Sequence, residues 1–356
     1  MLQIQEIDTS LEKISLRTPF VTALRRVEAV AFVRVVFTCN KGVIAYGEAP
    51  ATKAITGEDL ASILCAVASL KDDLIGLAPS EALKRLHVST IGSSAKAALD
   101  MAIVSLLAQQ NNQTLLEYLH VKDFSPIVTD VTISLNDAKT MLADAKEAVA
   151  NGFDVLKVKL GSDIEHAVDV TKSIAKNLPQ AQLLIDANQA WNLEQSLHYV
   201  QSVEDLHVKL IEQPVAAKEL ENLKIITQTT KIPILADEAV FTLEDVKNLY
   251  KKGYADMINI KLMKCGGLSK AREILEFARE KEIRCMLGSM LEGPVSINAT
   301  LCLAFAYRDV VKYVDLDSPL LYAELPEEIG DFAINRNQIK PKSPASSEAA
   351  NIPIFA

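Results

Sequence analysis

The sequence predicts an α/β protein, in which a smaller α+β domain precedes a parallel eight-stranded barrel of the TIM type. From about residue 128, apolar strand-like runs recur roughly every 25 residues and alternate with amphipathic helical stretches. Lysine, aspartate or glutamate stands at or near the C-terminal end of five of these runs. Residues 2–48 instead carry β-branched and apolar runs with no helical stretch between them, which is typical of antiparallel strands.

Length and composition exclude several classes of protein. A chain of 356 residues is long enough for two domains with sizeable cores, and 49% hydrophobic with 23% charged residues is ordinary for a globular protein. The net charge of -9 and the lack of a basic stripe argue against nucleic acid as a partner. We see neither a signal peptide nor an apolar run near the roughly 20 residues of a membrane helix, so we expect a cytoplasmic protein without a membrane partner.

The cysteines point to the same compartment. They are scattered and form no Cys-x-x-Cys pair, so we expect reduced thiols within the core. They are Cys39, Cys65, Cys265, Cys285 and Cys302.

Residues 1–124 are predicted to form the α+β domain. The run from Ala31 to Cys39 and the run from Val43 to Tyr46 flank Asn40-Lys41-Gly42, a hairpin loop that ends in glycine. Residues 18–26, between the first two strands, are predicted to be a loop. Helices are expected at residues 57–71, 80–88 and 94–110, the last of which has serine caps and a broad apolar surface.

Residues 125–320 are predicted to form the barrel. Its strands centre near Thr132, Val158, Ile185, Leu210, Leu235, Asn259, Met286 and Val314. Its helices are expected at 137–150, 163–177, 192–204, 217–228, 243–252, 268–281 and 295–306. No eighth helix is evident after Pro319, and residues 321–356 are expected to return to the first domain.

The strand-like run Val155–Leu160 carries two lysines on one face. Residues two apart in a strand point the same way, so Lys157 and Lys159 share a face. Two ammonium groups in an apolar strand are costly unless anionic groups lie opposite them. The next runs supply such groups and then a further lysine; they end in or near Asp186, Glu212, Asp237 and Lys261.

The three carboxylates predict a metal site. A single aspartate after a strand is more often a helix cap, but three on consecutive strands converge at the C-terminal mouth of a barrel, where active sites lie. Carboxylate oxygens suit Mg²⁺ or Mn²⁺. No histidine falls at a strand end, so neither a histidine ligand nor a histidine base is expected. Asn188 and Glu238 either orient the ligands or act as structural caps.

Lys159 and Lys261 are the candidate bases. They belong to the second and sixth strands and should face each other across the metal, where neighbouring cations would lower an ammonium pKa and free an amine. This arrangement suits removal of a proton α to a carboxylate, because the metal can hold that carboxylate and stabilise the enediolate. A base on each face predicts racemisation or epimerisation, with Lys157 helping to neutralise the carboxylate.

These residues resemble the muconate-lactonizing subgroup of the enolase superfamily, whose sites use lysine or histidine bases with Mg²⁺. The resemblance covers nearly the whole chain. It implies a (β/α)7β modified TIM barrel, an α+β capping domain completed by the tail, and one Mg²⁺ per subunit. The motifs that carry it are Lys157-Val-Lys159, Asp186-Ala-Asn188, Glu212-Gln-Pro214, Ala236-Asp237-Glu238 and the stretch from Asn259 to Gly267.

Two further stretches are similar to the dipeptide epimerases of that subgroup. Phe20 to Arg25 resembles their specificity loop, and Arg25 could pair with a glutamate carboxylate or be a surface arginine. Asp315 and Asp317 resemble the Asp-x-Asp motif that holds a dipeptide's α-ammonium; the alternative is a solvated strand end. The same similarity implies that the substrate site is lined by Thr132, Ser289 and Met290.

The resemblance implies Mg²⁺-dependent epimerisation of a dipeptide at the Cα of its second residue, by a homo-oligomer. The substrate would be Ala-Xaa, with Xaa small, apolar or glutamate. Relatives that act on Ala-Glu can carry a lysine shortly after the Gly-Ser-Met motif, and Gly288 to Pro294 contains none. The alternatives are an N-acylamino acid racemase or o-succinylbenzoate synthase of the same subgroup and, more remotely, a Schiff-base lyase on a TIM barrel.

Overall fold

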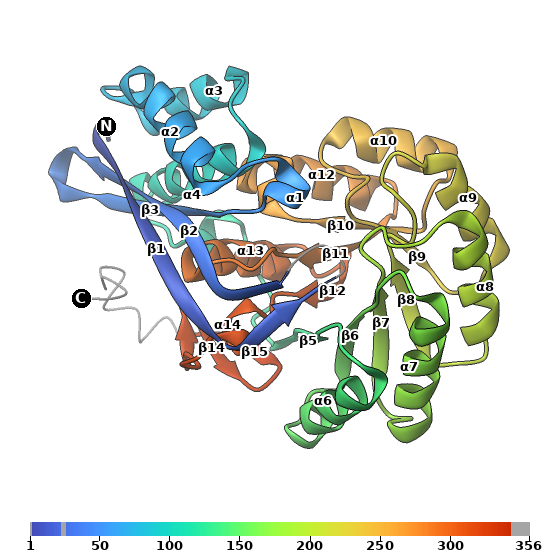
Figure 1. Ribbon diagram of the computed structural model, residues 1–356. Coiled ribbons are helices and arrows are strands. Elements are labelled where there is room, and N and C mark those ends of the chain that lie inside the picture. Colours follow the sequence, from blue (N-terminus) through green and yellow to red (C-terminus); the bar gives the residue numbers. More distant parts are fainter. Residues whose placement is uncertain (1, 23–25, 343–356) are drawn as a thin grey trace.

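Residues 2–22 and 26–342 are described by the structure, a computed structural model shown in Figure 1. These residues form an antiparallel sheet of three strands, a parallel sheet of eight strands that curves into a barrel, and a small sheet of four strands. The predicted fold class, a modified TIM barrel with an α+β capping domain, is confirmed. The domain boundary at residues 124 and 125 stays a prediction.

The capping sheet consists of β1 (Ile4–Val21), β2 (Arg26–Cys39) and β3 (Ile44–Pro50), each antiparallel to the next. The predicted hairpin turn is present, and Lys41 and Gly42 adopt positive φ angles of 69° and 73° there. The three predicted helices are α2 (Leu60–Leu74), α3 (Pro79–Val88) and α4 (Ser93–Gln110); the short α1 (Lys53–Thr56) and α5 (Leu115–Tyr118) were not predicted.

Helix α4 packs so closely on β3 that only glycine fits at the contact. A Cβ on Gly47 would lie 1.8 Å from the carbonyl oxygen of Ala98. Between Ser94 and Ala108 the helix is buried on nearly all sides, which explains the broad apolar surface of this stretch.

The prediction of a loop over residues 18–26 is wrong at both ends. Strand β1 continues to Val21 and β2 already begins at Arg26. The β1–β2 register shifts between Ser15 and Phe20, and beyond the shift Val21 accepts a hydrogen bond from the amide of Leu135 at 3.1 Å. The irregularity therefore directs the end of the hairpin towards the barrel.

All eight predicted barrel strands are present and pair in chain order. They are β5 (Val131–Ile133), β6 (Val155–Lys159), β7 (Gln182–Asp186), β8 (Val208–Glu212), β9 (Ile234–Ala236), β10 (Met257–Ile260), β11 (Arg284–Gly288) and β12 (Val311–Asp315).

The seven predicted barrel helices are also present. They are α6 (Ala138–Ala150), α7 (Ile164–Asn177), α8 (Leu193–Val203), α9 (Leu220–Thr229), α10 (Leu243–Lys252), α12 (Leu268–Glu280) and α13 (Pro294–Ala306). A short helix that was not predicted, α11 (Leu262–Cys265), follows directly after Lys261.

The barrel interior changes from apolar to polar at one level. A buried layer consists of Leu184, Leu210, Leu235, Met257 and Met286. Because inward-facing residues alternate along a strand, the next inward positions on four of these strands are Asp186, Glu212, Asp237 and Asn259. The apolar layer thus forms the floor under a polar site at the C-terminal ends of the strands.

Among the described residues, the first and last barrel strands are not paired by a regular ladder of backbone hydrogen bonds. They meet instead through a few bonds between two short segments. We call residues 129–132 and 314–317 the barrel seam. The amide of Asp130 donates to the carbonyl of Val314 at 3.1 Å, and the amide of Leu316 donates to Thr129 Oγ1 at 3.0 Å. These bonds place the end of β12 beside the start of β5.

Up to residue 342, where the described part of the tail ends, there is no full eighth helix, as predicted. The four-residue α14 (Ser318–Leu321) is followed by β13 (Glu328–Ile329), β14 (Phe332–Asn335) and β15 (Gln338–Pro341), which pairs with β4 (Ile127–Val128). The amide of Ala323 donates to the carbonyl of Ser15 in β1 at 2.8 Å. That residues 321–356 complete the capping domain stays a prediction, and residues 343–356 lie outside the described part.

The five cysteines are all free, and three of them are buried. The prediction of core thiols is wrong for Cys65, which is exposed on α2, and Cys265 is only partly buried. Among the described residues, no helix has both the length and the apolar character needed to cross a membrane.

Candidate active site

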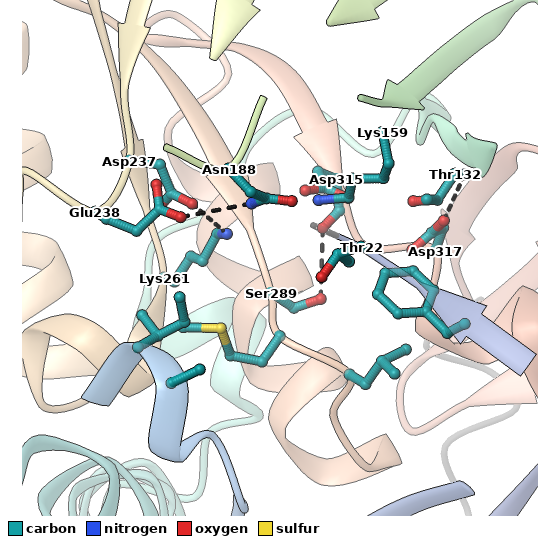
Figure 2. A pocket seen from close by; sticks show the side chains of 15 residues that line it. Thr22, Thr132, Lys159, Asn188, Asp237, Glu238, Lys261, Ser289, Asp315 and Asp317 are labelled. Atoms are coloured by element: carbon teal, nitrogen blue, oxygen red, sulfur yellow. Dashed lines mark hydrogen bonds and ion pairs between the residues drawn. The ribbon is translucent and has the colours of Figure 1, made fainter. Parts of the chain in front are cut away.

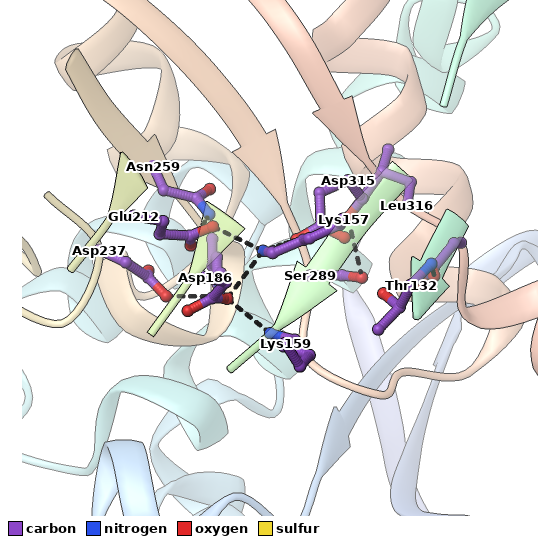
Figure 3. Close-up of polar contacts among 12 residues, drawn as sticks. Thr132, Lys157, Lys159, Asp186, Glu212, Asp237, Asn259, Ser289, Asp315 and Leu316 are labelled. Atoms are coloured by element: carbon purple, nitrogen blue, oxygen red, sulfur yellow. Dashed lines mark hydrogen bonds and ion pairs between the residues drawn. The ribbon is translucent and has the colours of Figure 1, made fainter. Parts of the chain in front are cut away.

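Lys157 lies at the centre of the polar layer. Its side chain is 1% exposed, and its Nζ lies 2.5 Å from Asp315 Oδ2, 2.7 Å from Glu212 Oε2 and 3.2 Å from Asp186 Oδ2 (Figure 3). Burial acts to lower the pKa of Lys157. The neighbouring carboxylates, Asp315 foremost, outweigh burial and raise the pKa well above its ordinary value. Lys157 is therefore a fixed cation.

Lys159 and Lys261 lie on opposite sides of one pocket, as predicted from their strands (Figure 2). Lys159 Nζ donates to Asp186 Oδ2 at 2.6 Å, and Lys261 Nζ donates to Asp237 Oδ2 at 2.7 Å. The expected lowering of the Lys261 pKa by neighbouring cations includes the metal ion and stays a prediction; the protein groups alone raise this pKa. Burial lowers this pKa, but the Asp237 carboxylate raises it by more, because the two groups are in contact.

The three predicted metal ligands are buried and stand at the ends of three neighbouring strands. Asp186 and Glu212 occupy paired positions on β7 and β8, and Asp237 follows β9. Burial and then repulsion from Asp186 raise the pKa of Glu212 to about 8, although Lys157 opposes them. Burial also acts to raise the pKa of Asp186, but Lys159 and Lys157 outweigh it and lower the value to about 2.

The donor set at these carboxylates fits a hard divalent cation. All three ligands offer oxygen, the atom that Mg²⁺ prefers. Glu212 Oε2 faces Lys157 as an ion pair but makes no hydrogen bond, and the buried Oδ1 atoms of Asn188 and Asn259 have no hydrogen-bond partner in the described part of the chain. Asp186, Glu212 and Asp237 are the residues that would hold the ion.

Neighbouring residues hold these carboxylates in place. The amide of Asn188 donates to Asp186 Oδ1 at 2.9 Å, and its side chain reaches Glu238 Oε1 at 3.5 Å. Lys264, which was not singled out from the sequence, donates to Asp237 Oδ1 at 2.5 Å and to the carbonyl of Asn259 at 2.9 Å. Its spacing of three from Lys261, across one turn of α11, is the signal that could have indicated it.

Asp315 and Asp317 extend the site to the barrel seam. Asp315 ends β12 and pairs with Lys157, whereas Asp317 Oδ2 accepts a hydrogen bond from the amide of Thr132 at 2.7 Å. Both are nearly buried, so the alternative of a solvated strand end is wrong. Burial and the nearby Asp315 raise the pKa of Asp317 to about 6.

The pocket above these groups encloses about 580 Å³, part of it open to solvent. The capping domain contributes apolar lining residues from the end of β1 and from α1 (Figure 2). Of these residues, only Phe20 was singled out from the sequence. Lys157, Asp186 and Glu212 lie beneath the lining, and Arg25 lies outside the described residues. The lining includes the predicted residues Thr132, Lys159, Asn188, Asp237, Glu238, Lys261, Ser289, Met290, Asp315 and Asp317.

Comparison with known families gives two matches, one in the N-terminal and one in the C-terminal part of the chain. Residues 140–340 match the family described as "Enolase C-terminal domain-like". Residues 5–119 match the N-terminal domain of the mandelate racemase / muconate lactonizing enzyme family.

Individual proteins are similar over nearly their full length. The L-amino acid-D/L-Glu epimerase of Sulfurimonas denitrificans is 55% identical, with 96% of this chain and 100% of that protein aligned. The hydrophobic dipeptide epimerase of Enterococcus faecalis is 34% identical over 89% of this chain and 91% of that protein.

Solved structures are likewise similar over nearly the full length of both chains. A substrate-liganded complex of the L-Ala-D/L-Glu epimerase from Bacillus subtilis superimposes with a TM-score of 0.90 at 34% identity, covering 96% of each chain. The Enterococcus faecalis dipeptide epimerase with Mg and L-Leu-L-Tyr gives a TM-score of 0.88 at 31% identity, covering 96% of this chain and 98% of that one. The protein therefore belongs to the mandelate racemase / muconate lactonizing enzyme family of the enolase superfamily and is an isomerase.

Proposed function

We propose that this isomerase inverts the Cα of the second residue of a dipeptide by moving a proton between Lys159 and Lys261. One observation carries the proposal: a single pocket is lined by these two lysines from opposite sides and by the Asp315–Asp317 pair. Two opposed bases are needed to invert a carbon, and a pair of carboxylates is suited to an ammonium group.

Asp186, Glu212 and Asp237 are proposed to hold one Mg²⁺, for which Mn²⁺ could substitute. When bound, Mg²⁺ would fix the substrate carboxylate and stabilise the negative charge that develops as the α-proton leaves. Solved structures of dipeptide epimerases from Enterococcus faecalis, Cytophaga hutchinsonii and Methylococcus capsulatus are complexes with Mg, which supports this assignment.

The proposed proton transfer uses the lysines alternately. For one epimer, the neutral amine of one lysine takes the α-proton while the ammonium of the other returns a proton to the opposite face. After turnover the two protonation states are exchanged, so the reverse reaction starts from the opposite lysine. Lys157 stays charged and helps to neutralise the substrate carboxylate, consistent with the carboxylates that surround it.

The proposed substrate is an Ala-Xaa dipeptide in which Xaa is small, apolar or glutamate. In the described part of the pocket, the side chains from Phe20, Ile55 and Leu291 are apolar, and the only basic lining residues are the two candidate bases. This favours a small or apolar Xaa. Glutamate stays among the candidates because the relative from Sulfurimonas denitrificans is named for D/L-Glu.

The test is a dipeptide library incubated with the Mg²⁺-loaded enzyme in D₂O and analysed by mass spectrometry. One deuterium should enter the Cα of the second residue, and both epimers should appear. Exchange only in N-acylamino acids would favour an N-acylamino acid racemase instead. Reductive trapping of a carbonyl substrate by borohydride would favour the Schiff-base alternative. A cytoplasmic location and a homo-oligomer stay predictions.

A further inference from the structure

A third aspartate, Asp130, lies beside Asp315 and Asp317. Each of the three offers a carboxylate oxygen within 4.8 Å of the other two. Asp130 is 1% exposed, and neither of its oxygens has a hydrogen-bond partner among the described residues. By contrast, Asp317 accepts a bond from Thr132 and Asp315 pairs with Lys157. A buried carboxylate without a partner is costly, and that cost calls for an explanation.

The barrel seam fixes the position of Asp130. Its amide donates to the carbonyl of Val314, the residue directly before Asp315. Thr129, directly before Asp130, donates from its hydroxyl to the same carbonyl at 3.2 Å. Asp130 is not among the residues that line the pocket, whereas Asp315 and Asp317 are, so it can act on a ligand only through its neighbours.

The charges around Asp130 leave a negative excess. The groups that act on it are Asp315, Asp317 and Glu212, with Lys157 as the opposing cation. Lys157 also pairs with Asp186 and Glu212, so its charge is shared. Burial, followed by repulsion from Asp315 and Asp317, raises the pKa of Asp130 well above its usual range. An ammonium group that enters between Asp315 and Asp317 would attract the Asp130 carboxylate, and so oppose this repulsion and lower the pKa.

An organic ammonium suits this cluster. Asp315 and Asp317 line the pocket, so the amino group of a substrate bound there can reach them. The three N–H donors of an ammonium can be shared among the carboxylates, and its single positive charge lowers the negative excess.

We propose that Asp130 is a positioning residue for the substrate's α-ammonium: it holds a proton while the Asp315–Asp317 pair is alone, ionises when the ammonium arrives, and so sets the preference for a free amino terminus. The proton leaves to solvent, and the three carboxylates then face two cations, Lys157 and the ammonium, instead of Lys157 alone. This inference rests on the proposed dipeptide substrate and extends it to a residue outside the pocket lining.

The test is Asp130→Asn, which keeps the size of the side chain but removes its ability to ionise. For a free dipeptide, KM should rise about ten-fold, the lower end of what a charge-assisted contact contributes, with kcat within about two-fold of the wild type. For the N-acetylated dipeptide, both constants should stay unchanged. The control is Asp331→Asn, a half-buried aspartate whose pKa is also raised by burial and which lies outside the pocket lining.

Proton release provides a second measurement, which does not depend on a variant. Calorimetric binding of the free dipeptide to the Mg²⁺-loaded wild type, at several pH values and in buffers of different ionisation enthalpy, should show protons released. The N-acetylated dipeptide should release none, and Asp130→Asn should release fewer with the free dipeptide.

The outcomes separate this inference from the proposed function. If the wild type epimerises dipeptides but Asp130→Asn leaves KM and proton release unchanged, Asp130 plays no such part. Equal losses on free and acetylated substrates would reduce Asp130 to a structural role and also overturn the inference. If no dipeptide is epimerised by the wild type, the proposed function itself fails.

Discussion

The Asp317 carboxylate accepts a 2.7 Å hydrogen bond from the backbone amide of Thr132, a residue that lies 185 positions earlier in the chain. The bond joins the end of the barrel to its beginning across the seam, and both residues line the pocket. Because Oδ2 is occupied by this amide, the orientation of Asp317 is set before any ligand binds. A preorganised carboxylate of this kind binds an ammonium at a smaller entropic cost.

The first prediction concerns that ammonium. A charge-assisted contact is worth about 1.5–3 kcal/mol, so an N-acetylated dipeptide should lose about ten- to hundred-fold in kcat/KM relative to the free one. The double variant Asp315→Asn/Asp317→Asn should show a similar loss with the free dipeptide and little with the acetylated one. Equal kcat/KM for both substrates in the wild type would remove the ammonium site and favour an N-acylamino acid racemase.

The second prediction is a pH dependence that only the free dipeptide shows. Burial and the neighbouring Asp315 raise the pKa of Asp317 to about 6, so the group becomes protonated and loses its charge as the pH falls through about 6. The ratio of kcat/KM for free and acetylated dipeptides should therefore fall below pH 6. The measurement is a pair of pH profiles from pH 5 to 7.5 with Mg²⁺ saturating. A ratio that is constant over this range would contradict the role of Asp317.

The third prediction concerns the two candidate bases. Lys159→Ala and Lys261→Ala should each abolish epimerisation, because each lysine serves one face of the carbon. In D₂O, each variant should still exchange the α-proton of one epimer only, and of opposite epimers. The control is Lys209→Ala, which removes an exposed lysine on β8, a barrel strand that carries neither candidate base. Wild-type epimerisation by either single variant would show that the two-base mechanism is wrong.

The fourth prediction is dependence on a divalent cation. Treatment with EDTA should abolish turnover, and Mg²⁺ should restore it. Glu212→Gln should lower kcat/KM more than about ten-fold, because a charged ligand is replaced by a neutral one at a site with three carboxylates. Calorimetry with Mg²⁺ alone checks the assignment without relying on activity, since the variant should bind the ion more weakly. Full turnover after thorough chelation would rule out this metal site.

The fifth prediction concerns the joint between the capping sheet and the barrel. Glu48 on β3 is fully buried, pairs with Arg34 at 2.7 Å and accepts from the amide of Val295 at the start of α13 at 2.8 Å. Glu48→Ala should lower the free energy of unfolding by about 3 kcal/mol, because it leaves Arg34 without its partner. Urea denaturation measures this, with Asp73→Ala as the control at the exposed Asp73–Arg85 pair, where less than about 1 kcal/mol is expected.

The barrel and much of the candidate site could be predicted from the sequence alone. Strand and helix positions follow from local periods of 2 and 3.6 residues, which do not depend on distant parts of the chain. Because inward-facing positions recur every two residues along a strand, each of Lys157, Asp186 and Glu212 is the next inward residue after an apolar one on the same strand. Strand order in a parallel barrel then brings them to one mouth.

The contacts that join distant segments were decided only by the tertiary structure. Asp130 meets Asp315 because the barrel closes at the seam, and Lys264 reaches Asp237 because α11 turns back over the site. The direction of the Lys261 pKa shift also depends on one contact, with Asp237. None of these follows from periodicity, because a side chain's partner across the barrel depends on how the strands close and how the loops bend, and the charge state depends in turn on that partner.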